Sequence, residues 1–308
     1  MITRYTIEAN QLKEAPQGPH CVTVAVNPDE AGRKELLAEF AVDEHNLHSS
    51  LDPEEPARLE VEDGHLELIF KRPKNYSSKD HFLFKVSSMG LFLFKDRLLI
   101  VLSEEMPIFT GKYFKHVAGL KEIFLKLLYN AIFHFMEHLK VINMIADEIE
   151  TKITRSMENR YLLNMFTLEK SLVYYLNAIS SNAFVIERLK ANSEKLGFTE
   201  RSREFIDDVL IENTQCYKQA EIYSNIFASL VGARASIVSN NLNILLKNLN
   251  AIVIAIAVPS FFAGMGGMSE LTGLFGAENW YLTYPSFFAL MIVMGVAIFH
   301  LIKRFEKH

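Results

Sequence analysis

Two uncharged apolar runs in the last part of the sequence constrain the fold of this chain more than any other feature. Residues 248–269 carry no formal charge, and neither do residues 279–302. As a helix, the first run is roughly 33 Å long, which is enough to cross the hydrocarbon core of a bilayer. Two buried helices of a soluble protein are the alternative, but two such runs in tandem favour membrane spans. We therefore predict spans at about 248–268 and about 281–302.

The residues that flank these runs predict how the spans are oriented. The basic residues Lys303, Arg304 and Lys307 follow the second run. The connecting loop carries Glu270 and Glu278 but no lysine or arginine. Because basic flanks stay on the cytoplasmic side of a membrane, we expect the loop outside and both termini in the cytoplasm. The first residues contain no apolar core of a secretory signal, so we predict a multi-pass protein of the inner (cytoplasmic) membrane.

Charge and cysteine content narrow the function of the remaining residues. Charged residues make up 22% of the chain, an ordinary value for a water-soluble protein, so we expect the membrane part to be confined to residues 248–308. The net charge is −5 and no block of lysine and arginine stands out, so nucleic-acid binding is not predicted. Cys21 and Cys216 lie far apart and predict no disulfide framework. No phosphate-binding glycine loop is present, which argues against ATP-driven pumping.

Residues 1–112 have the pattern of a mixed α/β cytoplasmic domain of the α+β class. A helix is predicted after the first strand, with Asn27 or Asp29 as its N-cap and Pro28 near its start. Short runs rich in β-branched and aromatic residues, separated by polar breaks, predict strands. These runs are residues 21–26, 66–73, 81–88, 91–96 and 98–103.

Residues 113–247 have a helical pattern and predict a cytoplasmic helical stalk. A break is expected near Asn192–Thr199, where Gly197 can end a helix. The next helix can extend from Glu200 into the first span, because no strong breaker precedes Pro259. Such a helix has about 60 residues and a length of about 90 Å. A single small domain cannot cover so long a helix, so we expect several subunits to share the stalk.

A seam of small and polar residues follows this long helix at alternating steps of four and three. It comprises Asn225, Ser229, Gly232, Ser236, Ser239, Asn243, Leu246, Asn250, Val253, Ala257, Ser260 and Gly264. A coiled coil has an apolar seam, whereas here the apolar residues flank the seam on both sides. This arrangement is typical of parallel helices around a water-filled axis, although a solvated face or tight helix packing also accounts for it.

The part of the seam in and near the membrane is the predicted lining of a pore. Its residues are Asn243, Leu246, Asn250, Val253, Ala257, Ser260 and Gly264. Polar groups inside a membrane usually face an interior or a cavity, which favours the pore over a solvated face for Asn250 and Ser260. The seam carries no carboxylate, so it suits an ion that keeps much of its water. Mg²⁺, which gives up water reluctantly, has this property.

The segment 236–271, SIVSNNLNILLKNLNAIVIAIAVPSFFAGMGGMSEL, resembles the stalk-to-pore segment of the CorA family of divalent-cation transporters. That segment typically reads SNxxNxxMKxLT…P…AGxYGMN. The residues that match it in register are Ser239, Asn240, Asn243, Lys247, Leu249, Ala263, Gly264, Gly267 and Met268. Tyr284 and Pro285 before the second apolar run are also similar to the family, as are residues 40–51 and the pair Arg58 and Glu60. The resemblance covers nearly the whole chain.

The resemblance implies a transporter and not an enzyme. It implies a funnel-shaped homopentamer in a lipid membrane, in which each subunit has a cytoplasmic domain, a helical stalk and two spans. The first span would line the pore, and divalent cations would pass passively down their gradients. Mg²⁺ is the expected ion. The alternatives are Zn²⁺, Co²⁺ or Ni²⁺ transport by the same architecture, and a membrane scaffold that does not conduct.

The sequence departs from the family at the outer end of the first span. The family signature Gly-Met-Asn is replaced here by Gly267-Met268-Ser269, which we expect to form the selectivity mouth. In the family the asparagine carbonyls form a ring that binds hydrated Mg²⁺, and a serine hydroxyl is shorter with a weaker dipole. Glu270 and Glu278 follow, and several copies of them would form an anionic collar that raises the local cation concentration.

Two further groups of residues are candidates for metal binding. Asp207 and Asp208 lie on an acidic face of the long helix, and regulatory metal sites between subunits are the alternative to a solvated face. His134, Glu137 and His138 match the HxxEH pattern of some zinc peptidases. No third ligand of suitable spacing is evident, so a polar helix face is the favoured interpretation of that pattern.

Overall fold

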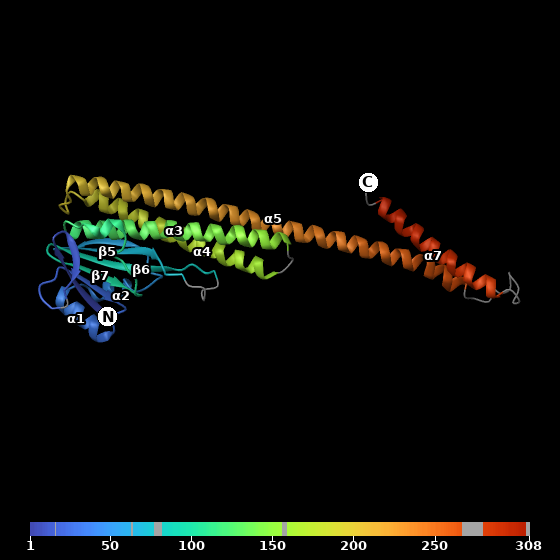
Figure 1. The fold of residues 1–308 in the computed structure, drawn as a ribbon, viewed down its shortest axis with the longest axis horizontal. Helices are drawn as coiled ribbons and strands as arrows, with labels where there is room; N and C mark the ends of the chain where they lie inside the picture. The colour runs from blue at the N-terminus through green and yellow to red at the C-terminus, as the bar shows by residue number, and fades with distance from the viewer. Residues whose placement is uncertain (16, 63, 77–81, 156–158, 267–279, 306–308) are drawn as a thin grey trace. The chain divides into compact units, whose positions relative to one another are not determined.

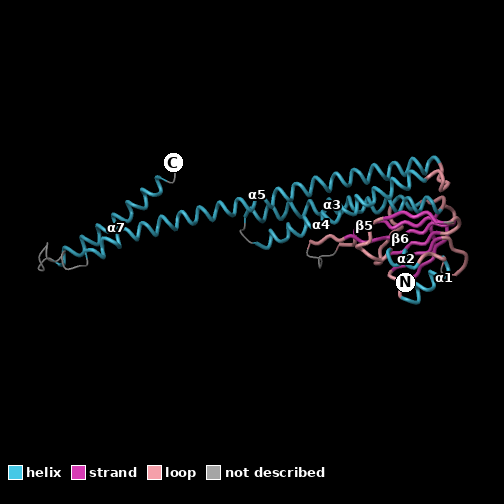
Figure 2. The backbone as a smooth tube through the Cα atoms, turned by 180° about the vertical axis from the view of Figure 1, so that it is seen from behind, coloured by secondary structure: helices cyan, strands magenta, loops and turns pink. Residues whose placement is uncertain are grey.

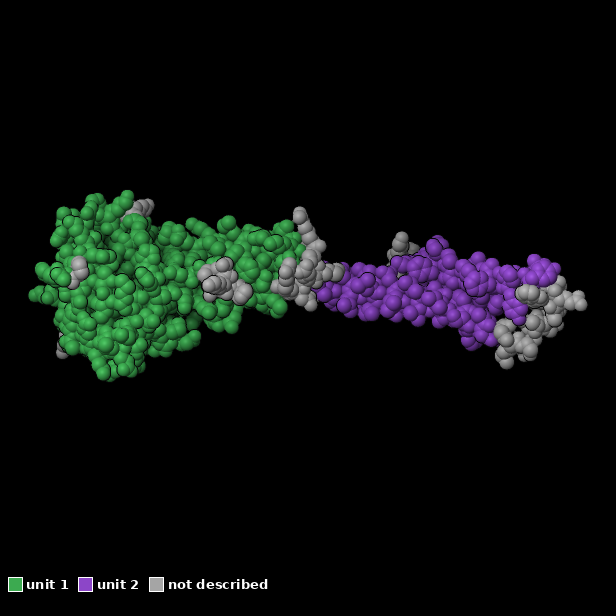
Figure 3. Space-filling model, turned by 60° about the horizontal axis from the view of Figure 1, so that its bottom comes forward, with its two compact units in different colours: residues 1–231 green, residues 232–308 purple. Residues whose placement is uncertain are grey.

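The structure is a computed structural model of residues 1–308. It describes the whole chain except residues 16, 63, 77–81, 156–158, 267–279 and 306–308. The chain divides into two compact units, residues 1–231 and residues 232–308 (Figure 3). The longest helix, α5 (Glu200–Gly266), contributes residues to both units. The predicted division into segments 1–112, 113–247 and 248–308 stays a prediction.

A seven-stranded mixed sheet forms the framework of the first unit (Figure 1). Its spatial order is β2-β1-β3-β7-β6-β5-β4, and β3 and β7 are the parallel pair. The strands are β1 (Ile2–Glu8), β2 (Gln11–Glu14), β3 (Val22–Val26), β4 (Arg58–Glu62), β5 (His65–Pro73), β6 (Val86–Phe94) and β7 (Leu98–Leu102). The central strand β7 is buried along its whole length, as expected for a strand that is covered on both faces.

Helices cover the two faces of this sheet and create two hydrophobic cores. The short helices α1 (Glu30–Phe40) and α2 (Glu44–Ser49) cover one face, where Leu36 and Phe40 pack with Leu99 and Val101. The long helices α3 (Leu120–Arg155) and α4 (Asn159–Asn192) cover the other face, with the 3₁₀ turn η2 (Lys112–Lys115) before α3 (Figure 2). Side chains alternate across a strand, so β7 supplies both cores at once.

The helix ends in this unit have local causes in the sequence. The Asp29 side chain accepts a hydrogen bond of 2.9 Å from the Gly32 amide and caps α1, as predicted for one of the two candidate caps. Gly197 has a φ of +66°, the left-handed conformation that follows many helix ends, and it lies in the predicted break. Lys121 donates hydrogen bonds to the carbonyl oxygens of Leu196 (2.8 Å) and Gly197 (2.6 Å), which ties this turn to α3.

Some strand predictions are wrong in their boundaries. The predicted strands 81–88 and 91–96 are replaced by the single strand β6, because β5 offers nine consecutive pairing positions from His65 to Pro73. Within this strand Gly90 leaves room for Ser50, which follows α2, since a Cβ there would collide with the Ser50 side chain. The strands β1, β2 and β4 and the separation of α3 from α4 were not expected from the pattern. The fold class itself is confirmed: a mixed sheet domain, long helices and two apolar helices at the C-terminal end.

Candidate functional site

In the described part of the chain, two helices are long and apolar enough to cross a membrane. They are the segments Glu200–Met265 of α5 and Tyr281–Phe305 of α7 (Trp280–Phe305). Their apolar side chains are exposed on the single chain: Phe261 and Val293 each keep 65% of their surface. Contiguous apolar surface of this extent has to be covered by lipid or by further protein. The predicted pair of C-terminal spans therefore agrees with the helices that the structure contains.

Within the second unit, α7 packs against one defined face of α5. Ala251 is almost fully buried and Pro259 is buried on the same side. A Cβ at Gly295 of α7 would lie 3.0 Å from the Ala255 carbonyl oxygen and 3.5 Å from Pro259 Cγ. Because proline has no N–H, the Ala255 carbonyl lacks its usual partner four residues ahead, and this freed oxygen faces Gly295. Small residues at both sides let the two backbones approach closely.

The predicted seam lies on the opposite face of α5. An α-helix turns by about 100° per residue, which places the seam roughly 180° from the face that contacts α7. Every predicted lining residue is accordingly exposed on the chain: Asn243, Leu246, Asn250, Val253, Ala257, Ser260 and Gly264. Among the described residues, no atom outside the local helix lies within 4 Å of a Cβ built at Gly264. The seam is therefore left open by the packing of α7.

The polar side chains of the seam have few partners within the chain. The Ser260 hydroxyl donates a hydrogen bond of 2.8 Å to the Ile256 carbonyl of its own helix, which satisfies its proton. Among the described residues, no side-chain hydrogen bond is formed by Asn243 or Asn250. Asn250 lies within the predicted span, where an amide left without partners is costly, so its side chain needs water or another polar surface.

Five predicted residues at the outer end of the spans lie outside the described part of the chain. They are Gly267, Met268 and Ser269 of the expected selectivity mouth, and Glu270 and Glu278 of the connecting loop. Their roles stay predictions. The last described residue of α5 is Gly266, which directly precedes the signature.

The two candidate regulatory carboxylates have different surroundings. Asp207 forms an ion pair with Lys190 of α4, with 2.8 Å between Oδ1 and Nζ. Asp208 lines a cavity of about 780 Å³ near the first turns of α3 and α5, together with Arg201 and Lys121. Within the described residues, no group of three or more histidine, cysteine, aspartate or glutamate side chains is placed to hold a metal. A metal at Asp207 and Asp208 would therefore need ligands from another copy.

The HxxEH pattern forms a buried aromatic cluster. His138 is 9% exposed, and its Nδ1 lies 2.6 Å from the hydroxyl of the buried Tyr175 on α4. The His134 and His138 rings are 4.4 Å apart. Burial, with the positive charge of Arg72 as a further cause, lowers the pKa of His134 to about 4. Burial and the neighbours His134 and Arg72 lower the pKa of His138 to about 3. These surroundings keep both imidazoles neutral, and His138 is engaged by Tyr175, which agrees with a structural role for the pattern.

Comparison with known proteins bears directly on this arrangement. A family model described as CorA-like Mg²⁺ transporter protein matches residues 24–304. This chain belongs to that family. The match extends from the first parallel strand to the end of the second span, so the CorA-like assignment covers the sheet, the long helices and both candidate spans. Family membership places the chain among membrane transporters and not among enzymes. No curated protein sequence matches the chain.

Solved structures share the same architecture at low sequence identity. The complete CorA magnesium transporter from Methanocaldococcus jannaschii is 17% identical, with a TM-score of 0.79, and the match covers 99% of this chain and 98% of that chain. The full-length CmaX protein is 12% identical, with a TM-score of 0.71 and coverage of 98% and 97%. The ZntB cytoplasmic domain from Vibrio parahaemolyticus is 12% identical, with a TM-score of 0.57 and coverage of 78% and 97%. At these identities the similarity shows a shared fold.

The packing face of α5 was missed by the sequence analysis. Ala251, Ala255 and Pro259 are spaced four residues apart, and Gly295 interrupts an otherwise bulky apolar helix. This spacing of small residues was the available signal for a helix contact in a membrane. The signal was ambiguous because the seam also consists largely of small residues.

Replacing Gly295 by leucine is expected to separate α7 from α5. A Cβ at this position already lies 3.0 Å from a backbone oxygen, and a leucine has no room beyond it. Overpacking of this kind typically costs about 1–3 kcal/mol. We expect a lower thermal midpoint for the purified protein in detergent. Val293→Leu, at an exposed position of the same helix, is the matched control, and an equal loss in both variants would contradict the contact.

Proposed function

We propose that this CorA-family protein is a passive transporter of divalent cations, with Mg²⁺ as its principal ion. The path crosses the inner (cytoplasmic) membrane through a homopentameric pore lined by the seam of α5, and both termini lie in the cytoplasm. The observation that carries the proposal is the position of the seam. Apart from Leu246 and Val253 the seam is polar or small, it is uncharged within the span, and it is turned away from the face of α5 that packs on α7.

A ring of five chains would use each face of α5 for a different contact. The face at Ala251 and Pro259 is covered by α7, so α7 takes the outer, lipid-facing position. The seam then faces the axis. The apolar shoulders between these two faces are exposed on the single chain and are available to pack against neighbouring copies. They include Leu242, Leu245, Leu249, Ile252 and Ile256, which are 46–64% exposed.

The chemistry of the seam favours an ion that keeps its hydration shell. Amides, hydroxyls and backbone groups can hydrogen-bond to the water around a cation without stripping it. Mg²⁺ dehydrates reluctantly, so this lining suits it. At the outer end, Gly267-Met268-Ser269 is proposed as the selectivity mouth. Glu270 and Glu278 are proposed as the collar that concentrates cations there.

Asp207 and Asp208 are proposed as regulatory metal ligands between neighbouring stalks. Asp207 is held by Lys190 in the single chain, so a metal would have to displace that lysine. Lys190→Met removes the competing ammonium. If the carboxylates bind a regulatory metal, the variant should respond to lower cytoplasmic Mg²⁺ than the wild type, measured as flux against internal Mg²⁺. An unchanged response would contradict this part of the proposal.

Uptake of Mg²⁺ into proteoliposomes tests the main proposal. We expect Mg²⁺ entry down an imposed gradient, and block by a hexaammine complex that mimics hydrated Mg²⁺. Mg²⁺ entry in the absence of both a proton gradient and ATP would agree with passive transport. Absence of flux for every divalent ion would contradict the proposal and favour a scaffold that does not conduct.

The serine of the signature motivates one alternative, transport of Zn²⁺, Co²⁺ or Ni²⁺ by the same pore. Competition among these metals in the same vesicles distinguishes the two functions. Ser269→Asn restores the family residue and is informative in both cases. Mg²⁺ flux that appears only in this variant would show that the natural protein transports another ion or none.

A further inference from the structure

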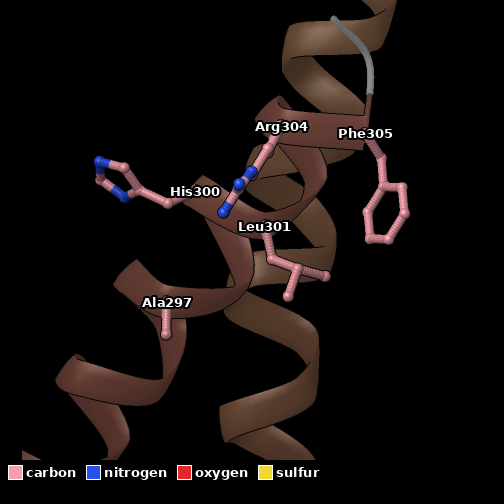
Figure 4. A pocket seen from close by; sticks show the side chains of 5 residues that line it. All are labelled: Ala297, His300, Leu301, Arg304 and Phe305. Atoms are coloured by element: carbon pink, nitrogen blue, oxygen red, sulfur yellow. The ribbon is translucent and has the colours of Figure 1, made fainter. Parts of the chain in front are cut away.

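A groove of about 470 Å³ lies at the C-terminal end of α7, the second predicted span (Figure 4). Ala297, His300, Leu301, Arg304 and Phe305 line it. These residues are spaced by three and four positions, so they share one face of the helix. In Figure 4 the guanidinium of Arg304 turns back toward the preceding turn, which carries His300 and Leu301.

The groove combines an apolar floor with a cation, Arg304. Leu301 and Phe305 are 58% and 75% exposed, and Ala297 continues the floor toward the membrane centre. Arg304 is exposed and forms no ion pair or hydrogen bond with a described residue. The neighbouring Lys303 differs, because its Nζ lies 5.7 Å from the centre of the Phe299 ring. Arg304 is therefore the cation that is oriented into the groove.

His300 has a defined orientation beside this cation. Its Nδ1 donates a hydrogen bond of 2.9 Å to the Val296 carbonyl, since a carbonyl oxygen can only accept. In the neutral ring Nε2 then carries a lone pair and cannot donate to an anion. Among the described lining residues, the capacity to bind an anion thus comes from the five N–H groups of Arg304, which match a phosphate in a bidentate geometry.

We infer that the groove binds an anionic phospholipid, with the lipid phosphate on Arg304 and an acyl chain along Leu301 and Ala297. The position supports a lipid, because the apolar floor continues into the hydrocarbon layer while the guanidinium lies at the level of the headgroups. A free phosphate ion would gain nothing from the floor. Basic residues near a membrane surface favour anionic over zwitterionic lipids. The inference rests on the membrane span and is independent of which ion is transported.

Native mass spectrometry of the full-length protein in detergent provides the test. The probes are phosphatidylglycerol and phosphatidylcholine with the same acyl chains. We expect the wild type to retain phosphatidylglycerol about fivefold better than phosphatidylcholine, as a single basic residue at the membrane surface can provide. Arg304→Gln should reduce this ratio to about one. Lys303→Gln removes the same charge from the adjacent position and should keep most of the preference.

Three outcomes would overturn the inference. Equal retention of both lipids by the wild type would show that the groove is covered or does not select an anion. Equal effects of Arg304→Gln and Lys303→Gln would show that diffuse surface charge, and not this groove, attracts the lipid. Displacement of phosphatidylglycerol by millimolar inorganic phosphate would show a site for the free anion. Leu301→Asn tests the apolar contact between the floor and the acyl chain separately from the charge of Arg304. It should weaken retention of both lipids while leaving the ratio of phosphatidylglycerol to phosphatidylcholine above one.

Discussion

Replacing Asn250 by leucine is expected to lower Mg²⁺ flux by at least about tenfold, because it would join the apolar rings of Leu246 and Val253 into one continuous hydrophobic stretch that excludes water. Asn250 lies on the open seam, and its side-chain amide has no hydrogen-bond partner among the described residues. In the proposed pentamer each subunit contributes one substituted side chain, so five leucines lie at the same level of the pore. The measurement is the initial rate of Mg²⁺ entry into proteoliposomes that contain equal amounts of protein.

Asn248→Leu is a closely matched control for this prediction. It makes the same substitution in the same helix, two residues away and roughly 200° around the helix axis. Asn248 is half-buried, on the side of α5 that carries Ala251 and α7. We expect flux within about twofold of the wild type, because the pore surface is unchanged. If Asn248→Leu blocked flux and Asn250→Leu did not, the seam would not be the lining and the pore would lie on the other face.

Lowering the pH from 6.5 to 5 is expected to reduce the free energy of unfolding of the first unit by about 2–4 kcal/mol. The folded protein holds the pKa of His134 at about 4 and that of His138 at about 3, against an ordinary value of 6.5. In this pH window the unfolded chain binds protons that the folded chain does not. Stability is therefore complete above pH 6.5 and is lost as the pH falls toward 4.

Urea unfolding followed by far-ultraviolet circular dichroism measures this effect, and hydrogen exchange of α3 amides localises it. The single tryptophan, Trp280, belongs to α7, so its fluorescence does not report on the first unit. His134→Phe keeps a ring beside His138 and removes one titrating group, so it should remove about half of the pH dependence. Phe133→Leu, an exposed neighbour on the same helix, should leave the slope unchanged. If the free energy of unfolding fell equally steeply with pH in the wild type and in His134→Phe, the assignment of this pH dependence to the two histidines would be contradicted.

The two spans and the seam could be predicted from the sequence because their signals are local. An uncharged run long enough to cross a bilayer can be recognised from its composition alone. The residues of a heptad seam follow from the fixed rotation per residue of an α-helix. The signature residues Gly267 and Met268 are recognisable for the same reason. Asp29 as an N-cap depends only on the amide three residues ahead. None of these features requires knowledge of distant parts of the chain.

Other features depend on contacts between residues that are far apart in the sequence, and only the tertiary structure decided them. The parallel pairing of Val22–Val26 with Leu98–Leu102 joins strands that no local pattern connects. His138 meets Tyr175 across two helices, and this burial turns an apparent metal-binding pattern into a neutral cluster. Likewise, α5 has two faces of small residues, and its sequence alone does not tell which one α7 covers. The contact of Gly295 with Ala255 and Pro259 decides this, and it leaves the seam of Asn250 uncovered by α7.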